Sequence, residues 1–168
     1  MVTSRPFQVL FLCTGNICRS PMAEGILKGI LSPRALSKSV ITSAGVAAIA
    51  GIPASEHAIT VCAENGYDIS EHRSRPLTQF LVEECNVILA MEEHHRVAAV
   101  RLAPTYARRV HLLSRYAAGD SHAPPLGVPD PIGGDFEEYQ SVFSRIEGYV
   151  TQALPRIEEE ILADAMET

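Results

Sequence analysis

A cysteine and an arginine near the N-terminus have the clearest capacity for chemistry in this sequence. Cys13 and Arg19 enclose the segment Cys-Thr-Gly-Asn-Ile-Cys-Arg, and Ser20 follows directly. A thiolate is a strong nucleophile, and a neighbouring guanidinium favours the ionised form of the sulfur. The planar guanidinium also binds two phosphoryl oxygens at once, and a serine hydroxyl can donate a hydrogen bond to the sulfur. This combination predicts attack on a phosphate ester through a phosphocysteine intermediate.

The elements around this segment predict a loop that binds anions. Residues 8–12 form a short apolar run rich in β-formers, which is typical of a strand buried on both faces. Pro21 begins a segment with apolar residues at helical spacing, and Ser20 is suited to cap that helix. Gly15 and Asn16 tolerate the unusual backbone angles of a tight curl. A strand that turns directly into a helix therefore directs backbone N–H groups into one concavity, at the positive end of the helix dipole.

Three other interpretations of the same residues involve no such chemistry. Cys13 could be a small buried hydrophobe and Arg19 a solvated charge, but the agreement of strand, turn, cap and proline favours the functional interpretation. A nucleoside-triphosphate loop is disfavoured because no Gly-Lys-Ser/Thr ending is present. A zinc site at Cys13 and Cys18 lacks a second pair of fitting spacing, since His94 and His95 are adjacent on a predicted polar surface helix. We therefore expect no metal.

Cleavage of a phosphate ester also requires an acid, which protonates the leaving oxygen and later takes a proton from water. Asp130 is the best candidate, because it lies in a long Pro/Gly-rich loop, residues 117–134, with a proline on each side. Asp120 and Asp135 belong to the same stretch. From composition alone, all three are equally well explained as turn aspartates that bind their own backbone.

The rest of the chain alternates predicted strands and helices, so we expect a doubly wound α/β fold with a parallel sheet. A single domain over residues 1–168 fits the length. Residues 117–134 form the only long loop. The expected strands after the first are 40–43, 86–91 and 110–113, and the expected helices after the first are 53–64, 93–102 and a C-terminal one from 136 that Pro155 kinks or restarts.

Composition narrows the function classes. The formal net charge is −6, so no basic footprint for nucleic acid or anionic membranes is present. The four cysteines do not form a dense framework, which favours reduced thiols and a cytoplasmic location. The first apolar run is too short for a membrane span.

The chain resembles the low-molecular-weight protein tyrosine phosphatase family. The resemblance rests on the segment Val9–Glu24, which reads Val-Leu-Phe-Leu-Cys-Thr-Gly-Asn-Ile-Cys-Arg-Ser-Pro-Met-Ala-Glu. It continues, in the family's order, through Ser43–Gly45, Gly51–Pro53, His72–Arg75, Ile88–Met91 and Asp130–Pro131. This resemblance implies a single-domain, flavodoxin-like three-layer sandwich with four parallel strands. It also implies a phosphorylated protein substrate, no cofactor, and a monomer or weak dimer.

The resemblance further implies a role for each residue of the site. It makes Cys13 the nucleophile, Arg19 the phosphate binder and Asp130 the general acid and then base. His72 and Asn16 would brace the phosphate loop, and Ser20 would stabilise the thiolate. The remaining phosphate-binding or substrate-binding residues are Thr14, Gly15, Ile17 and Cys18. Cys18 occupies the position of a family cysteine that forms a protective disulfide with the nucleophile, so a reversible Cys13–Cys18 bond is a hypothesis.

Two departures from the family pattern concern the substrate. Many members carry two aromatic residues directly after Asp-Pro, whereas this chain has Ile132-Gly133-Gly134. That feature resembles the branch that acts on phosphoarginine, which typically has threonine in place of Ile17. An apolar side chain at this position packs on an aromatic ring and offers a guanidinium no hydrogen bond. We therefore favour phosphotyrosine, with protein phosphoarginine as the alternative.

Two other classes of function stay open. An arsenate reductase of related fold would pass oxidation along further cysteines, for which Cys62 and Cys85 are the candidates, although they lie far apart in sequence. A binding module for phosphopeptides or oxyanions would keep the anion loop without turnover. Such a module needs neither a nucleophile nor an acid, so the combination of Cys13, Arg19 and Asp130 argues against it.

Overall fold

The computed structural model describes residues 5–167 and centres on a sheet of four parallel strands. The strands are β1 (Phe7–Cys13), β2 (Ser39–Gly45), β3 (Val87–Ala90) and β4 (Val110–Leu112), in the order β2-β1-β3-β4. The predicted α/β class and parallel sheet are confirmed, and each predicted strand end lies within two residues of the observed one. The domain boundary 1–168 stays a prediction.

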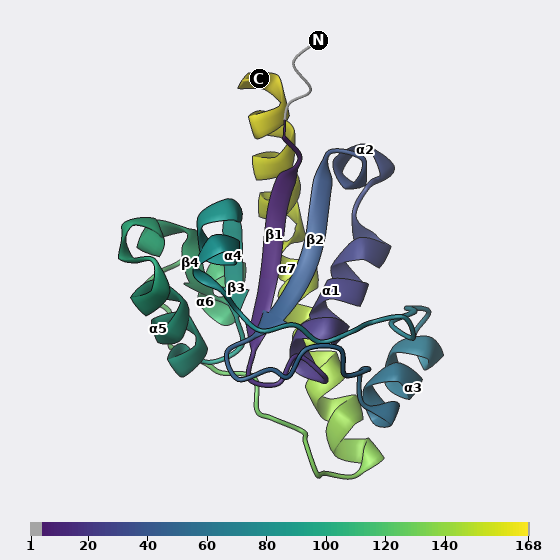
Figure 1. Ribbon diagram of the computed structural model, residues 1–168. Coiled ribbons are helices and arrows are strands. Elements are labelled where there is room, and N and C mark those ends of the chain that lie inside the picture. The colour runs from purple at the N-terminus through teal and green to yellow at the C-terminus, as the bar shows by residue number, and fades with distance from the viewer. Residues whose placement is uncertain (1–4, 168) are drawn as a thin grey trace.

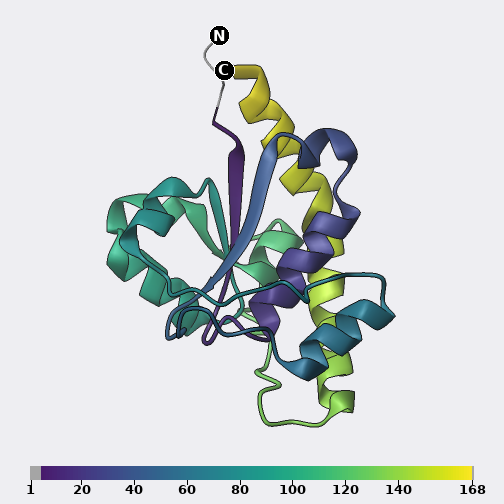
Figure 2. The same cartoon turned by 45° about the vertical axis from the view of Figure 1, so that its right-hand side comes forward.

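Helices cover both faces of this sheet and make the sandwich three layers thick (Figures 1 and 2). One face packs against α1 (Arg19–Ile30), α3 (Glu56–Glu64), α6 (Leu113–Ala118) and α7 (Phe136–Glu167). The other face packs against α4 (Gln79–Glu84) and α5 (Glu93–Leu102). The remaining elements are the short α2 (Pro33–Leu36) and the 3-10 helix η1 (Pro104–Arg109). None of the helices in residues 5–167 has the length and apolar character to cross a membrane.

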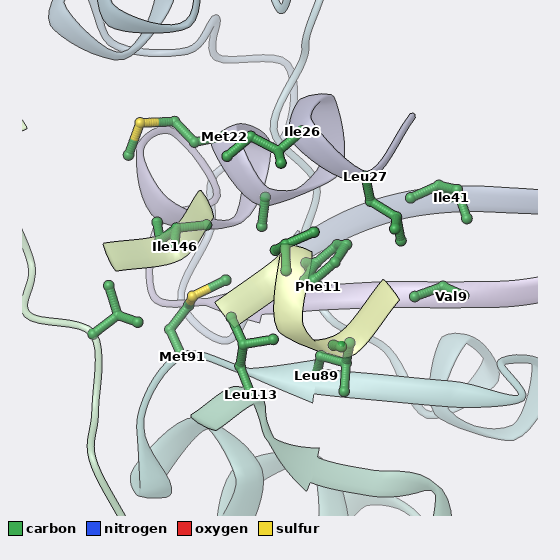
Figure 3. Packing of buried hydrophobic residues seen from close by; sticks show 14 of the residues in the cluster. Val9, Phe11, Met22, Ile26, Leu27, Ile41, Leu89, Met91, Leu113 and Ile146 are labelled. Carbon is green, nitrogen blue, oxygen red and sulfur yellow. The ribbon is translucent and has the colours of Figure 1, made fainter. Parts of the chain in front are cut away.

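Strand β1 is the centre of both cores because its side chains alternate between two apolar faces. Val9 and Phe11 point toward α1 and α7, and Leu10 and Leu12 point toward α4 and α5. All four are fully buried. Figure 3 shows side chains of the first of these cores, among them Met22 of α1, Ile41 of β2 and Leu89 of β3. The loop after β1 is therefore anchored on a strand that is buried on both faces.

Several helix predictions need correction. The helix predicted over 53–64 begins at Glu56. The short helices α2, α4 and α6 have four to six residues each and were not predicted. Helix α6 occupies the segment where the sequence predicts a strand end and the start of the long loop. One or two helical turns contain too few residues for a periodic apolar pattern, so these elements depend on tertiary packing.

Pro155 does not restart the C-terminal helix, because α7 is continuous over 32 residues. A proline inside a helix removes a backbone hydrogen bond and costs about 3 kcal/mol. Buried side chains on both sides of it, Val150, Ala153, Ile157 and Ile161, keep both halves of α7 packed on the sheet. This packing offsets the local cost of the proline.

The topology sets the position of the functional loop. The chain leaves β1 for β2 on one side, whereas β3 and β4 lie on the other side. In open parallel sheets, ligands bind beyond the carboxyl ends of the strands at such a reversal of strand order. The segments that follow β1 and β3 meet there, where Thr14 contacts His95 and Arg19 contacts Glu92.

Candidate active site

The loop between β1 and α1 forms one wall of a cavity of about 150 Å³. Most of the residues that the sequence singles out lie around it. The lining residues are Cys13, Thr14, Gly15, Ile17, Cys18, Arg19, Asp130 and Ile132. Three of the predicted residues, Asn16, Ser20 and His72, are not part of this lining. They are joined to the lining residue Cys13 or to one another by hydrogen bonds. The sequence therefore identified a set of residues that the fold does bring together.

A chain of hydrogen bonds runs from the Cys13 thiol into the protein. Cys13 Sγ lies 2.9 Å from Ser20 Oγ, and Asn16 Nδ2 donates to the same Ser20 oxygen at 2.8 Å. Because Asn16 supplies a donor, the Ser20 proton is left for an acceptor, and the sulfur at 2.9 Å is nearer than the Ala44 carbonyl oxygen at 3.4 Å. Ser20 is the second residue of α1, and the N-cap is Cys18, without a side-chain cap. The predicted cap role of Ser20 is therefore wrong, since its hydroxyl is directed at Cys13.

Asn16 is the residue that holds the curl of the loop. It is fully buried and has a positive φ of 56°, which asparagine tolerates better than most residues. Its Nδ2 also donates to Ser43 Oγ at 2.9 Å, and its Oδ1 accepts from the Arg75 N–H at 2.9 Å. His72 Nε2 donates to its carbonyl oxygen at 2.7 Å. The second predicted special residue, Gly15, has no positive φ, so the expectation of unusual angles holds for Asn16 alone.

Gly45, at the end of β2, allows the loop to approach the sheet closely. A Cβ at this position would lie 2.4 Å from the Thr14 carbonyl oxygen and 2.9 Å from the Asn16 nitrogen. Both atoms belong to the backbone of the loop, so neither can move without displacing the loop itself. In the sequence, Gly45 is distinguished only as part of a matching motif, and the structure supplies the steric reason for a glycine there.

Arg19 is buried, with 1% of its surface exposed, so the interpretation as a solvated charge is wrong. Its Nη1 donates to a Glu92 carboxylate oxygen and, at 2.9 Å, to the Val128 carbonyl. Its Nη2 lies 3.1 Å from Asp130 Oδ2 and 3.3 Å from Thr14 Oγ1. Two carboxylates from separate loops therefore compensate the buried charge, and one of them, Glu92, was not predicted.

Asp130 is distinguished from the other two loop aspartates by its contact with Arg19. Its side chain remains 37% exposed at the mouth of the cavity, and its Oδ1 accepts from the Ile132 N–H at 3.2 Å. Asp120 accepts from the His122 N–H and Asp135 from the Glu138 N–H. Asp120 is a turn aspartate, as the simpler interpretation expected, whereas Asp135 caps the N-terminus of α7.

His95 corrects the prediction of a purely polar surface helix. His94 is exposed, but His95 is fully buried at the N-terminus of α5 and its Nε2 lies 2.7 Å from Thr14 Oγ1. Burial lowers the pKa of His95 to about 3, with a smaller contribution from His94 and Arg19. Glu92 and His95 form a reciprocal capping box. A carboxylate and a histidine three residues apart, directly after a buried strand, were the signal that could have revealed them.

The same residues form the group of possible metal ligands in the described part of the chain. One ligand atom each of Glu92, His94 and His95 lies within 4.8 Å of the others. Both ring nitrogens of His95 are already hydrogen-bonded, to the Glu92 N–H and to Thr14. Glu92 is paired with Arg19. These contacts leave no complete ligand set.

The remaining cysteines occupy separate environments. Cys18 Sγ lies 3.2 Å from the Tyr139 hydroxyl and 3.4 Å from Ser55 Oγ, and burial raises its pKa. Cys62 and Cys85 belong to the cores on opposite faces of the sheet, where burial raises their pKa values to about 12 and about 11. They cannot pass oxidation from one to the other directly. The Cys13–Cys18 disulfide stays a prediction.

The geometry defines an α/β protein with a thiol, a buried guanidinium and a carboxylate around one anion-sized cavity. The family model described as low molecular weight phosphotyrosine protein phosphatase matches residues 8–163. The chain is 34% identical to the protein-arginine-phosphatase of Bacillus subtilis, covering 90% of this chain and 97% of that protein. It is 35% identical to low molecular weight protein-tyrosine phosphatase A of Mycobacterium tuberculosis, covering 86% and 87%.

A solved structure extends this similarity to three dimensions. It is a mutant of the YwlE arginine phosphatase with a phosphorylated active-site serine, 32% identical, with a TM-score of 0.81 over 90% of this chain and 95% of that one. The chain therefore belongs to the low molecular weight protein-tyrosine phosphatase family. Members of this family are hydrolases, and Cys13 and Arg19 lie in the position of its phosphate loop.

The close approach at Gly45 leads to a test of the loop's support. We expect Gly45→Ala to lower the free energy of unfolding by about 2 kcal/mol or more, because the new methyl group overlaps backbone atoms. Gly148→Ala is the matched control, since Gly148 lies exposed in α7 with open space around it. Alanine should stabilise that helix by about 0.5–1 kcal/mol. Urea denaturation measures both, and equal effects would contradict the steric argument.

The environment of His95 predicts a pH dependence of stability. Its pKa is about 3 in the folded protein and about 6.5 when unfolded, so the unfolded chain binds more protons between these values. Stability contributed by neutral His95 is complete above pH 6.5 and decreases toward pH 3. We expect a loss of about 1–2 kcal/mol between pH 6.5 and pH 5.

His95→Gln provides the comparison, because glutamine does not titrate. His111, whose pKa is also lowered by burial, is present in both proteins and contributes equally. Urea denaturation at the two pH values should therefore give a smaller pH effect in the variant. The same slope in both proteins would show that His95 is accessible to protons in the folded state.

Proposed function

We propose that this protein hydrolyses phosphotyrosine in proteins, with Cys13 as nucleophile, Arg19 as phosphate clamp and Asp130 as general acid and base. In the first step, the Cys13 sulfur forms a bond to phosphorus while the bond to the tyrosine oxygen breaks, and Asp130 protonates that oxygen. In the second step, water attacks the phosphocysteine, Asp130 takes the water proton, and the thiolate leaves with inorganic phosphate as product. The observation that carries the proposal is the common cavity of these three side chains.

The charges around Arg19 support this division of roles. Glu92 and Val128 occupy Nη1, so the Nε–Nη2 edge is the one that a phosphoryl group meets, beside Asp130. A phosphoryl group there places negative oxygens against the Asp130 carboxylate. Like charges at one site favour the protonated acid, which is the form needed to donate to the leaving oxygen.

The supporting residues act on the thiolate and the loop. The Ser20 hydroxyl stabilises the sulfur as thiolate before attack and as leaving group in the second step. Asn16 and His72 hold the curl, so that the loop N–H groups of Thr14, Gly15, Ile17 and Cys18 face the oxyanion. The phosphorylated serine in the YwlE mutant supports a phosphoenzyme intermediate on the residue that corresponds to Cys13.

The walls of the cavity favour an aromatic leaving group. Ile17 and Ile132 line the mouth, and neither side chain offers a hydrogen bond to a guanidinium nitrogen. Protein phosphoarginine is the second candidate, because Gly133 and Gly134 supply no aromatic wall and an arginine phosphatase is among the similar proteins.

Two other classes fit the site less well. An arsenate reductase needs a relay of thiols, but Cys62 and Cys85 lie on opposite faces of the sheet. A module that only binds phosphate needs no thiol with a serine hydroxyl at hydrogen-bond distance, as Cys13 has in Ser20. The expected setting of the reaction is the cytoplasm, and the expected assembly is a monomer or weak dimer.

Hydrolysis of p-nitrophenyl phosphate in the presence of a chelator tests the mechanism. Cys13→Ser should lower kcat by more than about a thousand-fold, because a neutral hydroxyl replaces the thiolate. Asp130→Ala should lower kcat by about 100-fold or more for tyrosine phosphate, and by less for p-nitrophenyl phosphate, whose leaving group needs little protonation. Chelator-sensitive turnover, or full activity in Cys13→Ser, would overturn the proposal, and equal losses in Asp130→Ala would assign the acid elsewhere.

Substrate preference is tested with two peptides of the same sequence that carry either phosphotyrosine or phosphoarginine. We expect the higher kcat/KM for phosphotyrosine, and a shift of the ratio toward phosphoarginine by about tenfold or more in Ile17→Thr. Ile17→Val is the matched control, since it shortens the side chain without adding a polar group. A wild-type preference for phosphoarginine would establish the second candidate.

A further inference from the structure

The Thr14 side chain has a hydrogen-bond arrangement that the proposed mechanism does not use. Thr14 follows the nucleophile directly and lines the same cavity as Cys13 and Asp130. Its hydroxyl oxygen lies 2.7 Å from His95 Nε2 and 3.3 Å from Arg19 Nη2. Two nitrogens from different elements therefore converge on one hydroxyl at the wall of the cavity.

The contacts of His95 determine which of its nitrogens carries the proton. The backbone N–H of Glu92 donates to His95 Nδ1 at 3.1 Å, so Nδ1 is an acceptor and carries no proton. The ring is fully buried and neutral at physiological pH. A neutral imidazole protonated on one nitrogen must then carry its proton on Nε2. His95 Nε2 therefore donates to the Thr14 oxygen.

This tautomer determines which hydrogen bonds the Thr14 hydroxyl accepts and which it can donate. A hydroxyl oxygen accepts two hydrogen bonds and donates one. His95 and Arg19 are both donors, and together they fill the two acceptor positions. Within residues 5–167, the structure gives the hydroxyl no further bond. Its own proton is therefore the group that remains for a ligand, and Thr14 lines the cavity.

We propose that the Thr14 hydroxyl is a catalytic residue that donates a hydrogen bond to a phosphoryl oxygen, and that His95 is the positioning residue that directs it. This inference rests on the proposed function and adds a donor to it. Arg19 and the loop N–H groups bind the phosphoryl oxygens. In the transition state, the negative charge is spread over all three of these oxygens. A preoriented hydroxyl stabilises that charge further without reorganisation during the reaction.

The first turn of α5 orients both side-chain donors, the Arg19 guanidinium and the Thr14 hydroxyl. Glu92 pairs with Arg19 through its carboxylate, and the capping box ties the same residue to His95. The N-terminus of α5 thus holds the guanidinium with one residue and the threonine hydroxyl with another. This arrangement gives a role to a buried histidine in the first turn of a helix whose other first-turn residues are polar.

Substitution of Thr14 tests the donor. Thr14→Val keeps the shape and removes the hydroxyl, and we expect kcat for p-nitrophenyl phosphate to fall by about 10- to 100-fold, with the affinity for vanadate lowered similarly. Thr14→Ser should recover most of the loss, because it restores the donor. Thermal denaturation checks that each variant folds, and Thr14→Ala replaces Thr14→Val if the latter does not. Unchanged kcat and vanadate affinity without the hydroxyl would overturn the inference.

His95 is tested through the same readouts. His95→Gln places an amide N–H near the position of Nε2 and should retain more activity than His95→Leu, which has no donor. In Thr14→Val, the two His95 variants should differ little, because the hydroxyl that His95 directs is absent. Equal kcat in His95→Gln and His95→Leu, or a His95 effect that persists undiminished in Thr14→Val, would show a merely structural role.

The outcome is separable from that of the proposed function. If the wild type releases no phosphate, or Cys13→Ser keeps full activity, the proposed phosphatase mechanism fails. If the wild type is active and Cys13→Ser is inactive, but Thr14→Val equals the wild type, only the role of Thr14 fails.

Discussion

The burial of the Arg19 guanidinium is the constraint on which the site depends. Only 1% of the surface of Arg19 is exposed, and a buried charge is stable only when other groups replace the water that it has lost. Those groups come from separate segments of the chain: Thr14 from its own loop, Glu92 after β3, and Val128 and Asp130 from the long loop. Each contact fixes the position of one of these segments. The functional residues are therefore gathered around Arg19 because its charge must be compensated.

This arrangement gives Arg19's two carboxylate partners different roles. Glu92 is tied to the helix behind it by the capping box, whereas Asp130 is exposed at the mouth and held by an adjacent turn. In the proposed mechanism, a phosphoryl group competes with Asp130 for the guanidinium but leaves the pair with Glu92 intact. In that mechanism, Arg19 keeps one fixed counter-charge when substrate enters, and the displaced carboxyl group, that of Asp130, is the proposed proton donor.

The sequence predicted the parts of the site that follow from local patterns. Strand, turn and helix identify the loop from Cys13 to Arg19, because each has a signal of its own. Asp130 could be separated from Asp120 and Asp135 only by resemblance, since the distinguishing contact with Arg19 is tertiary. His95 was missed because its capping box uses histidine where glutamate or glutamine is usual, and its polar neighbours indicated a surface helix. The need for Gly45 depends on a close approach between two segments, which no local pattern reports.

The residues to which we assign substrate choice lie outside the buried network around Arg19. Ile17 is half-buried and Ile132 is 55% exposed, and each lines the cavity without a side-chain hydrogen bond. Substitutions at these positions therefore change the fit of the leaving group without disturbing Arg19 or the thiol. The identities of this chain to an arginine phosphatase and to a tyrosine phosphatase, 34% and 35%, are nearly equal. Overall similarity therefore does not separate the two candidate substrates, and the proposed preference rests on the side chains at the mouth.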